Sequence, residues 1–257
     1  MLNFRNTNIF FIALLIILIG VHVKYGLPVY IYPLLFVAWS LIVFWGCYDV
    51  GSNFFIKIVC KADTNKKEIA ISFDDGPAVN FTPAILQVLK NENVKATFFC
   101  IGNRIAGNEH ILSQIQEDGH VIGNHSYSHH FWFDMYTEKK MQEDLTQMDK
   151  EMERVTGLKP KLFRPPYGVT NPNLKKAIIK GGYTPVGWNV RSMDTVIKEE
   201  NKLLRKINTG IKPGAVFLFH DTSKATLSVL PEFIKEVKKR GYNIIPLHKL
   251  LALQPYA

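Results

Sequence analysis

The sequence predicts an α/β protein in which parallel strands are covered by helices. From residue 67 onward, short apolar segments alternate with segments of helical length, and this repeated order is typical of a parallel sheet. Polar side chains follow the ends of several apolar segments, where α/β proteins usually carry their chemistry. Two long uncharged segments come first and predict a transmembrane helical hairpin. The pattern leaves open whether the sheet closes into a barrel.

The N-terminal segment, residues 1–48, has the composition of two membrane-spanning helices. Residues 6–23 carry no formal charge apart from a protonatable His22, and residues 25–48 carry none. Each stretch is long enough to approach or cross a hydrocarbon core of roughly 30 Å. Three residues separate the stretches and predict a short turn: Lys24, Gly26 and Pro28.

A cleaved signal peptide followed by a buried helix is the alternative. No small-residue cleavage site follows the first stretch, and the bulky Phe44 and Trp45 argue against a lipoprotein-type site at Cys47. The sequence therefore favours a retained anchor with both chain ends on one side of the membrane. Basic residues lie before, within and after the hairpin, at Arg5, Lys24, Lys57, Lys61, Lys66 and Lys67. The positive-inside rule therefore gives a mixed result for the orientation.

The whole chain is basic, with 31 Lys plus Arg against 22 Asp plus Glu and a formal charge of +9. This excess suits anionic lipid head groups or an anionic cell-surface polymer. A nucleic-acid partner is not expected, because the sequence contains neither a recognition motif nor a basic run interleaved with aromatic residues. Cys47, Cys60 and Cys100 are widely spaced and odd in number, so they predict neither a metal cluster nor a disulfide framework.

Residues 49–66 are less apolar and more charged than the hairpin, which predicts a juxtamembrane linker with one docking turn at residues 54–59. Residues 67–257 form the predicted catalytic domain. Its first strand begins near residue 69, where β-branched residues dominate, and Gly76 and Pro77 end it.

Two adjacent carboxylates, Asp74 and Asp75, stand at the end of this first strand. Consecutive strand residues point to opposite faces of a sheet, so the two side chains are expected to have different partners. One would bind a metal while the other handles protons. An Asp-rich turn closed by Gly-Pro, without any catalytic role, is the alternative reading of this stretch alone.

The next helix is expected to begin at Thr82 as N-cap, with Pro83 at its first position. Further strands are predicted from the apolar segments at residues 95–102, 120–123, 161–163, 183–190, 215–219 and 243–247. Further helices are predicted at residues 109–118, 137–156, 173–181, 199–208 and 227–240, with a last helical turn near the C-terminus. Several of these helices end at glycine, as at Gly119 and Gly157.

Four strand ends carry candidate functional groups, namely the Asp74–Asp75 pair, the His125–His129 pair, Arg164 and His220. In a parallel sheet the C-terminal strand ends meet at one rim, so these groups are expected to converge. On one helical turn, the i, i+4 spacing would place His125 and His129 within reach of one cation. A carboxylate from another strand end would complete a His, His, Asp set that leaves positions open for water and substrate.

Four motifs in this order resemble those of the polysaccharide deacetylases, the NodB-homology group of carbohydrate esterase family 4 type. They are residues 72–77 (Ser-Phe-Asp-Asp-Gly-Pro), 125–129 (His-Ser-Tyr-Ser-His), 164–168 (Arg-Pro-Pro-Tyr-Gly) and 218–221 (Leu-Phe-His-Asp). The resemblance covers about residues 67–250. It implies a deformed (β/α) barrel, a divalent metal, most often zinc, and hydrolytic removal of acetyl groups from N-acetylated sugars.

The resemblance implies a role for each matching residue. The metal ligands would be Asp75, His125 and His129. Asp74 would be the general base that takes a proton from the attacking water. The backbone N–H of Tyr167 would stabilise the tetrahedral oxyanion, and His220 would protonate the leaving amine.

Supporting roles follow from the same resemblance. Arg164 would orient the base and keep it ionised, while Asp194 would steady the protonated His220. Substrate contacts are expected from Trp188, Pro166, Tyr167 and Leu218. Taken singly, Arg164 would be read as a salt-bridging arginine, Asp194 as a loop residue and His220 as a helix-capping or buried histidine.

Two positions depart from the family pattern. Thr195 follows Asp194 where many members have tryptophan, and Arg191 stands where an acidic residue is frequent. The wall of the groove and the surroundings of His220 are therefore expected to differ. The aromatic run at residues 131–133 predicts either a sugar-stacking edge or, more commonly for such runs, part of the core.

The sequence as a whole predicts a membrane-anchored, metal-dependent N-deacetylase acting on an acetylated polysaccharide or peptidoglycan. Its catalytic domain is expected outside the cytoplasm, on the grounds of the resemblance and not of charge. An O-acetyl carbohydrate esterase is the alternative within enzymes, since the same chemistry suits a better leaving group. A catalytically silent, metal-holding carbohydrate-binding scaffold is the alternative outside enzymes.

Overall fold

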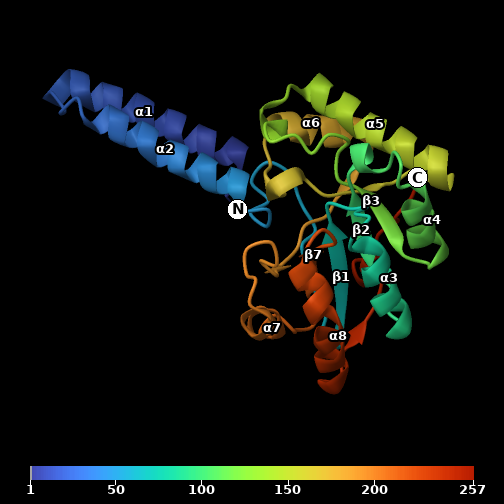
Figure 1. Ribbon diagram of the computed structural model, residues 1–257. Coiled ribbons are helices and arrows are strands. Elements are labelled where there is room, and N and C mark those ends of the chain that lie inside the picture. Colours follow the sequence, from blue (N-terminus) through green and yellow to red (C-terminus); the bar gives the residue numbers. More distant parts are fainter. Residues whose placement is uncertain (1) are drawn as a thin grey trace.

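The computed structural model describes residues 2–257 and consists of a long helical hairpin attached to one side of an α/β domain (Figure 1). The hairpin is formed by α1 (Phe4–Tyr25) and α2 (Ile31–Tyr48). Gly26 ends α1 in the left-handed region, with φ of 69°, and its amide donates to the carbonyl of His22. Both helices are long and apolar enough to cross a membrane, and most of their side chains are exposed.

The hairpin is hydrogen-bonded to the domain at its base. The amide of Phe4 donates to the carbonyl of Phe54 over 3.0 Å, and the amide of Thr170 donates to the carbonyl of Cys47 over 2.9 Å. Gly46 lies directly against Phe54, since a Cβ on Gly46 would come within 2.3 Å of that ring. The end of α2 is therefore fixed against the domain.

Residues 49–66 pack along the domain more extensively than the single docking turn that the sequence predicts. Four apolar side chains of this segment are buried: Val50, Phe54, Phe55 and Ile58. Val59 forms an isolated parallel bridge with Val186, and the amide of Ala62 donates to the carbonyl of Gly214 over 3.0 Å. Backbone pairing and apolar burial thus make this linker part of the domain surface.

All strand pairs in the sheet are parallel, and the order is β5-β4-β3-β2-β1-β7-β6, with β8 paired to the beginning of β1. The strands are β1 (Glu68–Asp74), β2 (Thr97–Cys100), β3 (Val121–Asn124), β4 (Leu162–Phe163), β5 (Thr184–Pro185), β6 (Val190–Arg191), β7 (Val216–His220) and β8 (Asn243–Ile244). The deformed barrel of parallel strands is confirmed as a curled, incomplete barrel.

The single strand predicted over residues 183–190 is wrong. The segment forms two short strands, because β5 pairs with β4 at one edge of the sheet and β6 pairs with β7 at the other. Residues 186–189 cross between these edges. A local apolar pattern predicts an extended segment but not that its two ends pair with different partners.

Helices pack around the sheet (Figure 1). They are α3 (Thr82–Asn91), α4 (Glu109–Glu117), α5 (Glu138–Thr156), α6 (Pro172–Gly181), α7 (Glu200–Asn208), α8 (Lys224–Lys239) and α9 (Leu247–Leu250). Three short 3-10 turns complete the domain: η1 (Gly102–Arg104), η2 (Phe133–Met135) and η3 (Pro166–Gly168). The largest buried cluster joins β1, β2 and β7 to α3, α4 and α8, and five phenylalanines lie in it: Phe73, Phe98, Phe217, Phe219 and Phe233.

Capping explains where several helices begin and end. Thr137 accepts a hydrogen bond from the amide of Lys140 and caps the N-terminus of α5, and Gly157 ends that helix with φ of 69°. The N-cap predicted at Thr82 is wrong, because Phe81 occupies that position. The Thr82 hydroxyl instead accepts from the amide of Ala78 and donates to Asp221.

Candidate functional site

The predicted site residues gather at the C-terminal rim of the sheet, because β1, β3, β4 and β7 end side by side. Asp74 at the end of β1 lies opposite His220 of β7, and Asn124 of β3 lies opposite Phe163 of β4. They surround a pocket of about 200 Å³. Its lining consists of Asp74, Asp75, His125, His129, Pro165, Tyr167, Gly168, Trp188, Arg191, Thr195, Leu218 and His220.

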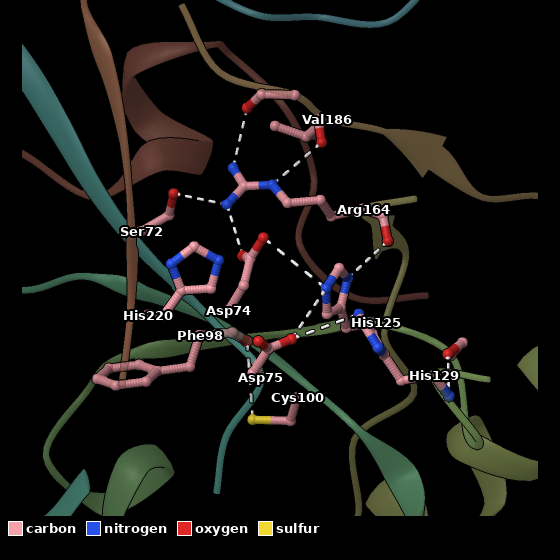
Figure 2. A network of polar contacts seen from close by, with 12 residues as sticks. Ser72, Asp74, Asp75, Phe98, Cys100, His125, His129, Arg164, Val186 and His220 are labelled. Atoms are coloured by element: carbon pink, nitrogen blue, oxygen red, sulfur yellow. Dashed lines mark hydrogen bonds and ion pairs between the residues drawn. The ribbon is translucent and has the colours of Figure 1, made fainter. Parts of the chain in front are cut away.

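Asp75, His125 and His129 converge on one point (Figure 2). Oδ1 of Asp75 lies 3.5 Å from Nε2 of His125 and 3.4 Å from Nε2 of His129. Asp75 has φ of 78°, in the left-handed region, so the alternation of the strand stops there. The expected opposite faces are therefore wrong: Asp74 and Asp75 both reach the pocket and both lie close to Nε2 of His125. Their other partners differ, since Asp74 is held by Arg164 and Asp75 lies beside His129.

The two histidines come together without a helical turn. Residues 125–130 form an irregular loop, in which Ser126 has φ of 67° and His129 has φ of 43°. The hydroxyl of Ser126 accepts from the amide of His129 over 2.9 Å, and the Asn124 side chain accepts from the amide of Ser126. The predicted helical turn is therefore wrong. Side-chain hydrogen bonds within the loop, and not helical geometry, bring the two imidazoles together.

The donor set fits a divalent cation. The ligand atoms of Asp75, His125 and His129 all lie within 4.8 Å of one another. Oδ1 of Asp75 is buried and accepts no hydrogen bond from residues 2–257, so its lone pairs are free to bind a cation between the two imidazoles. Nδ1 of His125 lies 2.8 Å from the carbonyl of Arg164, which leaves Nε2 as the ligand nitrogen. Two nitrogens and one oxygen are a set that zinc accepts at open sites.

The charges of these three residues agree with that assignment. Although burial opposes it, contact with the two imidazoles lowers the pKa of Asp75 well below its usual range. Burial and the neighbouring His125 lower the pKa of His129 to about 4, so this ring is neutral near pH 7. Burial alone would lower the pKa of His125, but the charges of Asp74 and Asp75 raise it. A cation bound here would replace a proton at His125.

Arg164 is fully buried and holds Asp74 from behind the pocket. Its guanidinium donates to Oδ1 of Asp74 over 2.7 Å and to the hydroxyl of Ser72 over 2.8 Å. It also donates to the carbonyls of Val186 and Gly187, and the group stacks on the ring of Phe99 at 4.0 Å. Oδ2 of Asp74 remains directed at the pocket, 3.8 Å from Nε2 of His125 (Figure 2).

Replacing Arg164 with leucine is expected to destabilise the domain by about 3–5 kcal/mol, because the change leaves Asp74 buried without its charge partner. The midpoint of thermal unfolding of the detergent-solubilised chain should fall by about 10 °C. Arg205→Leu is the matched control, since Arg205 forms an exposed pair with Glu199 that is worth about 0–1 kcal/mol. Equal midpoints for both variants would show that the buried pair does not stabilise the fold.

Asp194 binds His220 through its side chain and its backbone. Oδ1 of Asp194 lies 2.7 Å from Nδ1 of His220, and Oδ2 accepts from the His220 amide over 2.7 Å. Thr226 donates to the same Oδ2, and the hydroxyl of Ser223 donates to the Asp194 carbonyl. Burial favours the neutral ring, but the Asp194 carboxylate outweighs burial and raises the pKa of His220 to about 8. His220 therefore carries a proton near pH 7.

The protonated ring predicts a specific pH profile. A reaction that needs the acid form of His220 should slow as the pH rises through about 8, the folded-state pKa of that ring. In Asp194→Asn the attraction that raises this pKa is gone, so the alkaline limb of kcat/KM should move to lower pH by about one unit or more. Glu200→Gln, an exposed change on α7, serves as the control. An unmoved limb in Asp194→Asn would show that His220 is not the titrating acid.

Asp221 and Thr82 support the loop that carries Asp75. Oδ2 of Asp221 accepts from the Thr82 hydroxyl over 2.6 Å, and that hydroxyl accepts from the amide of Ala78 over 2.8 Å. A Cβ on Gly76 would lie 2.0 Å from Oδ2 of Asp221, so only glycine fits there. Burial raises the pKa of Asp221 to about 7.

The remaining predicted residues form the rim of the pocket. Tyr167 lies in η3 with φ of 59°, its ring 4.7 Å from that of His129, and Leu218 and Trp188 line the same pocket. Pro166 is buried and does not line the pocket, whereas its neighbour Pro165 does. The aromatic residues 131–133 have different surroundings. Phe133 is 2% exposed and belongs to the core, whereas Phe131 is 69% and Trp132 is 58% exposed.

Sequence reasoning missed several residues of the site, and they share one property. Pro165, Ser72, Ser223 and Thr226 act through tertiary contacts with Arg164, Asp194 or the pocket. Ser72 and Pro165 lie inside recognisable motifs, so the motifs themselves were a signal. For Ser223 and Thr226 the sequence contains no local signal, because their partner Asp194 is remote in the chain.

Comparison with known proteins agrees with this geometry. The family model for polysaccharide deacetylase matches residues 61–186. The peptidoglycan-N-acetylglucosamine deacetylase PgdA of Listeria monocytogenes is 35% identical over 195 residues, which are 75% of this chain and 40% of that protein. The chain thus spans well under half of that relative. The peptidoglycan-N-acetylmuramic acid deacetylase PdaA of Bacillus subtilis is 32% identical over 193 residues, covering 74% of this chain and 73% of PdaA.

A solved structure shows the same likeness in three dimensions. The crystal structure of the Bc1960 peptidoglycan N-acetylglucosamine deacetylase superposes with a TM-score of 0.74 at 30% identity, and the match covers 78% of this chain and 95% of that one. The shared fold, the identity over most of PdaA and the ordered motifs at the sheet rim agree with one another. This chain belongs to the polysaccharide deacetylase family.

Proposed function

We propose that this protein is a membrane-anchored, metal-dependent hydrolase that removes N-acetyl groups from N-acetylglucosamine-type polysaccharide or peptidoglycan. The observation that carries the proposal is the convergence of Asp75, His125 and His129 on one point, with Asp74 and His220 in the same pocket. The names of the relatives, which are peptidoglycan deacetylases, support the substrate class.

Asp75, His125 and His129 would hold the cation, which we propose is zinc. When bound, such a cation polarises the acetamide carbonyl and lowers the pKa of water. Asp74 then accepts the proton of the attacking water through Oδ2, because Arg164 occupies its Oδ1. The guanidinium fixes the direction of that carboxylate.

The second half of the reaction uses His220 and Tyr167. The nitrogen of an amide is a poor leaving group until it is protonated, and His220 holds a proton for it. Asp194 orients the ring through Nδ1, so the proton at Nε2 is available to the substrate. The backbone N–H of Tyr167 stabilises the oxyanion, in a turn whose positive φ sets the direction of its peptide groups.

Incubation of the purified full chain and zinc with N-acetylglucosamine oligomers and with peptidoglycan tests the proposal. Mass spectrometry should show the loss of one acetyl group per modified sugar, together with a new free amine. Acetate release without a new amine would indicate an O-acetyl esterase instead. No acetate from any of these substrates, in a folded and zinc-loaded protein, would indicate a silent carbohydrate-binding scaffold.

The location of the domain needs a separate test. We propose that α1 and α2 span the membrane and that the domain lies on the periplasmic or external side, where the polymer is found. Lys198 is exposed and provides a site for labelling. In intact cells, a membrane-impermeant amine reagent should label Lys198, and a Lys198→Arg variant identifies the labelled peptide. Labelling only after the cytoplasm is opened would contradict this location.

A further inference from the structure

A second groove continues from the catalytic pocket toward the hairpin. Trp188 and Arg191 line both the groove and the pocket, so the two spaces meet at these side chains. The groove has a volume of about 760 Å³, well above the 200 Å³ of the pocket. Its opposite wall is formed by residues 49–61, which belong to the segment that the sequence predicts to be a juxtamembrane linker with one docking turn. The proposed deacetylation leaves this groove without a role.

The groove is positively charged. Lys57, Lys61 and Arg191 line it, all three are exposed, and none of them forms an ion pair with any residue of the described chain 2–257. Asp49 is the only acidic residue among its lining residues within that range, and its Oδ1 already accepts from the amide of Gly51. Asn189 adds a neutral side chain to the lining, whereas the Asn53 amide already donates to the carbonyl of Gly51. This combination suits an anionic group, above all phosphate oxygens, which accept from lysine and from arginine.

The groove also begins where the hairpin ends. Asp49 is the residue after α2. Within the last turn of α2, the carbonyl of Cys47 accepts from the amide of Thr170, two residues beyond η3. Val50 packs against Gly168 of η3, and Gly168 also meets the indole of Trp188. The hairpin base therefore lies beside η3, whose Tyr167 and Gly168 line the catalytic pocket. With α1 and α2 in a membrane, the groove would face the lipid head groups while the pocket lies next to it.

From this arrangement we infer that the substrate is a membrane glycolipid in which an acetylated sugar is joined through phosphate or diphosphate to the lipid. The inference rests on the proposed deacetylase function and specifies its substrate. Lys57, Lys61 and Arg191 bind the phosphate groups, and the sugar extends past Trp188 into the pocket. A neutral polymer would leave these three cations unused. Neither an anionic polymer nor a free sugar phosphate would require the groove to end at the hairpin.

The test compares three substrates on the zinc-loaded full chain in lipid nanodiscs. They are N-acetylglucosamine joined through diphosphate to a polyprenyl chain, N-acetylglucosamine 1-phosphate in solution, and a neutral N-acetylglucosamine tetramer. The wild-type kcat/KM for the lipid-linked substrate should exceed that for the neutral tetramer at least about tenfold at low salt, and added salt should reduce this preference. Similar values for the lipid-linked and the soluble phosphate would overturn the membrane source.

Variants then assign the preference to the groove. The quantity to follow is the ratio of kcat/KM for the lipid-linked substrate to kcat/KM for the neutral tetramer. In the triple variant Lys57→Gln/Lys61→Gln/Arg191→Gln this ratio should fall about tenfold, since each lost charge-assisted contact weakens phosphate binding. Lys235→Gln/Lys239→Gln removes two exposed charges near the far end of α8 and should leave the ratio at its wild-type value. The double variant Lys57→Gln/Lys61→Gln keeps Arg191, which also lines the pocket. A lower ratio in this variant would show that the effect does not arise inside the pocket.

The outcomes separate this inference from the function on which it rests. Activity on the tetramer without any preference for the lipid-linked substrate would overturn the inference and leave the deacetylase proposal standing. A preference that persists in the triple variant, at an unchanged melting temperature, would show that the groove does not bind the phosphate. Absence of acetate from all three substrates and from peptidoglycan would overturn both proposals.

Discussion

Replacing His125 with alanine is expected to lower the affinity for zinc by more than about a hundredfold and to abolish acetate release. Loss of a mere supporting contact around a metal ligand typically costs about 10–100-fold in affinity, and here a ligand nitrogen itself is lost. The remaining Asp75 and His129 offer two ligand atoms, which is one fewer than zinc hydrolases use. Competition with a chromogenic chelator measures the affinity, and acetate release measures the activity.

His110→Ala is the matched control, because His110 is exposed on α4 and does not line the pocket. His125 is fully buried, so its replacement can also weaken the fold. His129→Ala therefore provides a second test at a partly exposed ligand, where the zinc affinity should again fall while the melting temperature changes less. Retention of wild-type zinc affinity in both variants would contradict the assignment of this site.

Much of the fold follows from the sequence where local rules decide. The helix α5 was predicted at residues 137–156 and is observed at Glu138–Thr156, because Thr137 caps one end and Gly157 permits the left-handed turn at the other. Strand-like segments preceded the polar motifs, so their convergence at one rim followed from the parallel sheet. These features depend on residues that are close in sequence or on the topology of the sheet alone.

The rest depended on contacts between distant segments. Asp75 turns into the pocket because its backbone adopts φ of 78°, in a loop that Gly76, Thr82 and Asp221 support from below. A non-glycine residue in this conformation pays a strain energy, which tertiary contacts must offset. No periodicity in the sequence reports such an arrangement. The same reason explains why the helical turn expected at residues 125–129 is an irregular loop.

The packing of the linker, residues 49–66, also depends on contacts between distant segments and could not be predicted from the sequence. Residues 49–66 read as a polar connection, since their apolar side chains are scattered and no regular period joins them. In the structure, the bridge between Val59 and Val186 and the packing of Val50 against Gly168 attach this segment beside the pocket. The groove at the hairpin base exists because of this packing.

Asp74→Asn is expected to lower kcat by about 10²–10⁴-fold while zinc affinity stays close to that of the wild type. The amide side chain has nearly the same shape, and its oxygen still accepts from Arg164, so the buried contact behind the pocket survives. The position that faces the pocket would lose its ability to take a proton, which is the contribution of a general base. In the proposed site, zinc binding depends instead on Asp75 and the two histidines.

Because Asp74→Asn is expected to change kcat but not the zinc affinity, this variant distinguishes an enzyme from a metal-holding scaffold. Asp63→Asn, an exposed change in the segment before β1, should alter neither quantity and controls for the loss of one carboxylate. If Asp74→Asn released acetate at the wild-type rate, Asp74 would not be the base, and the trio could hold its metal for binding alone. If kcat and zinc affinity fell together, Asp74 would belong to the metal site. Only a loss of kcat at unchanged zinc occupancy agrees with proton transfer through Oδ2 of Asp74.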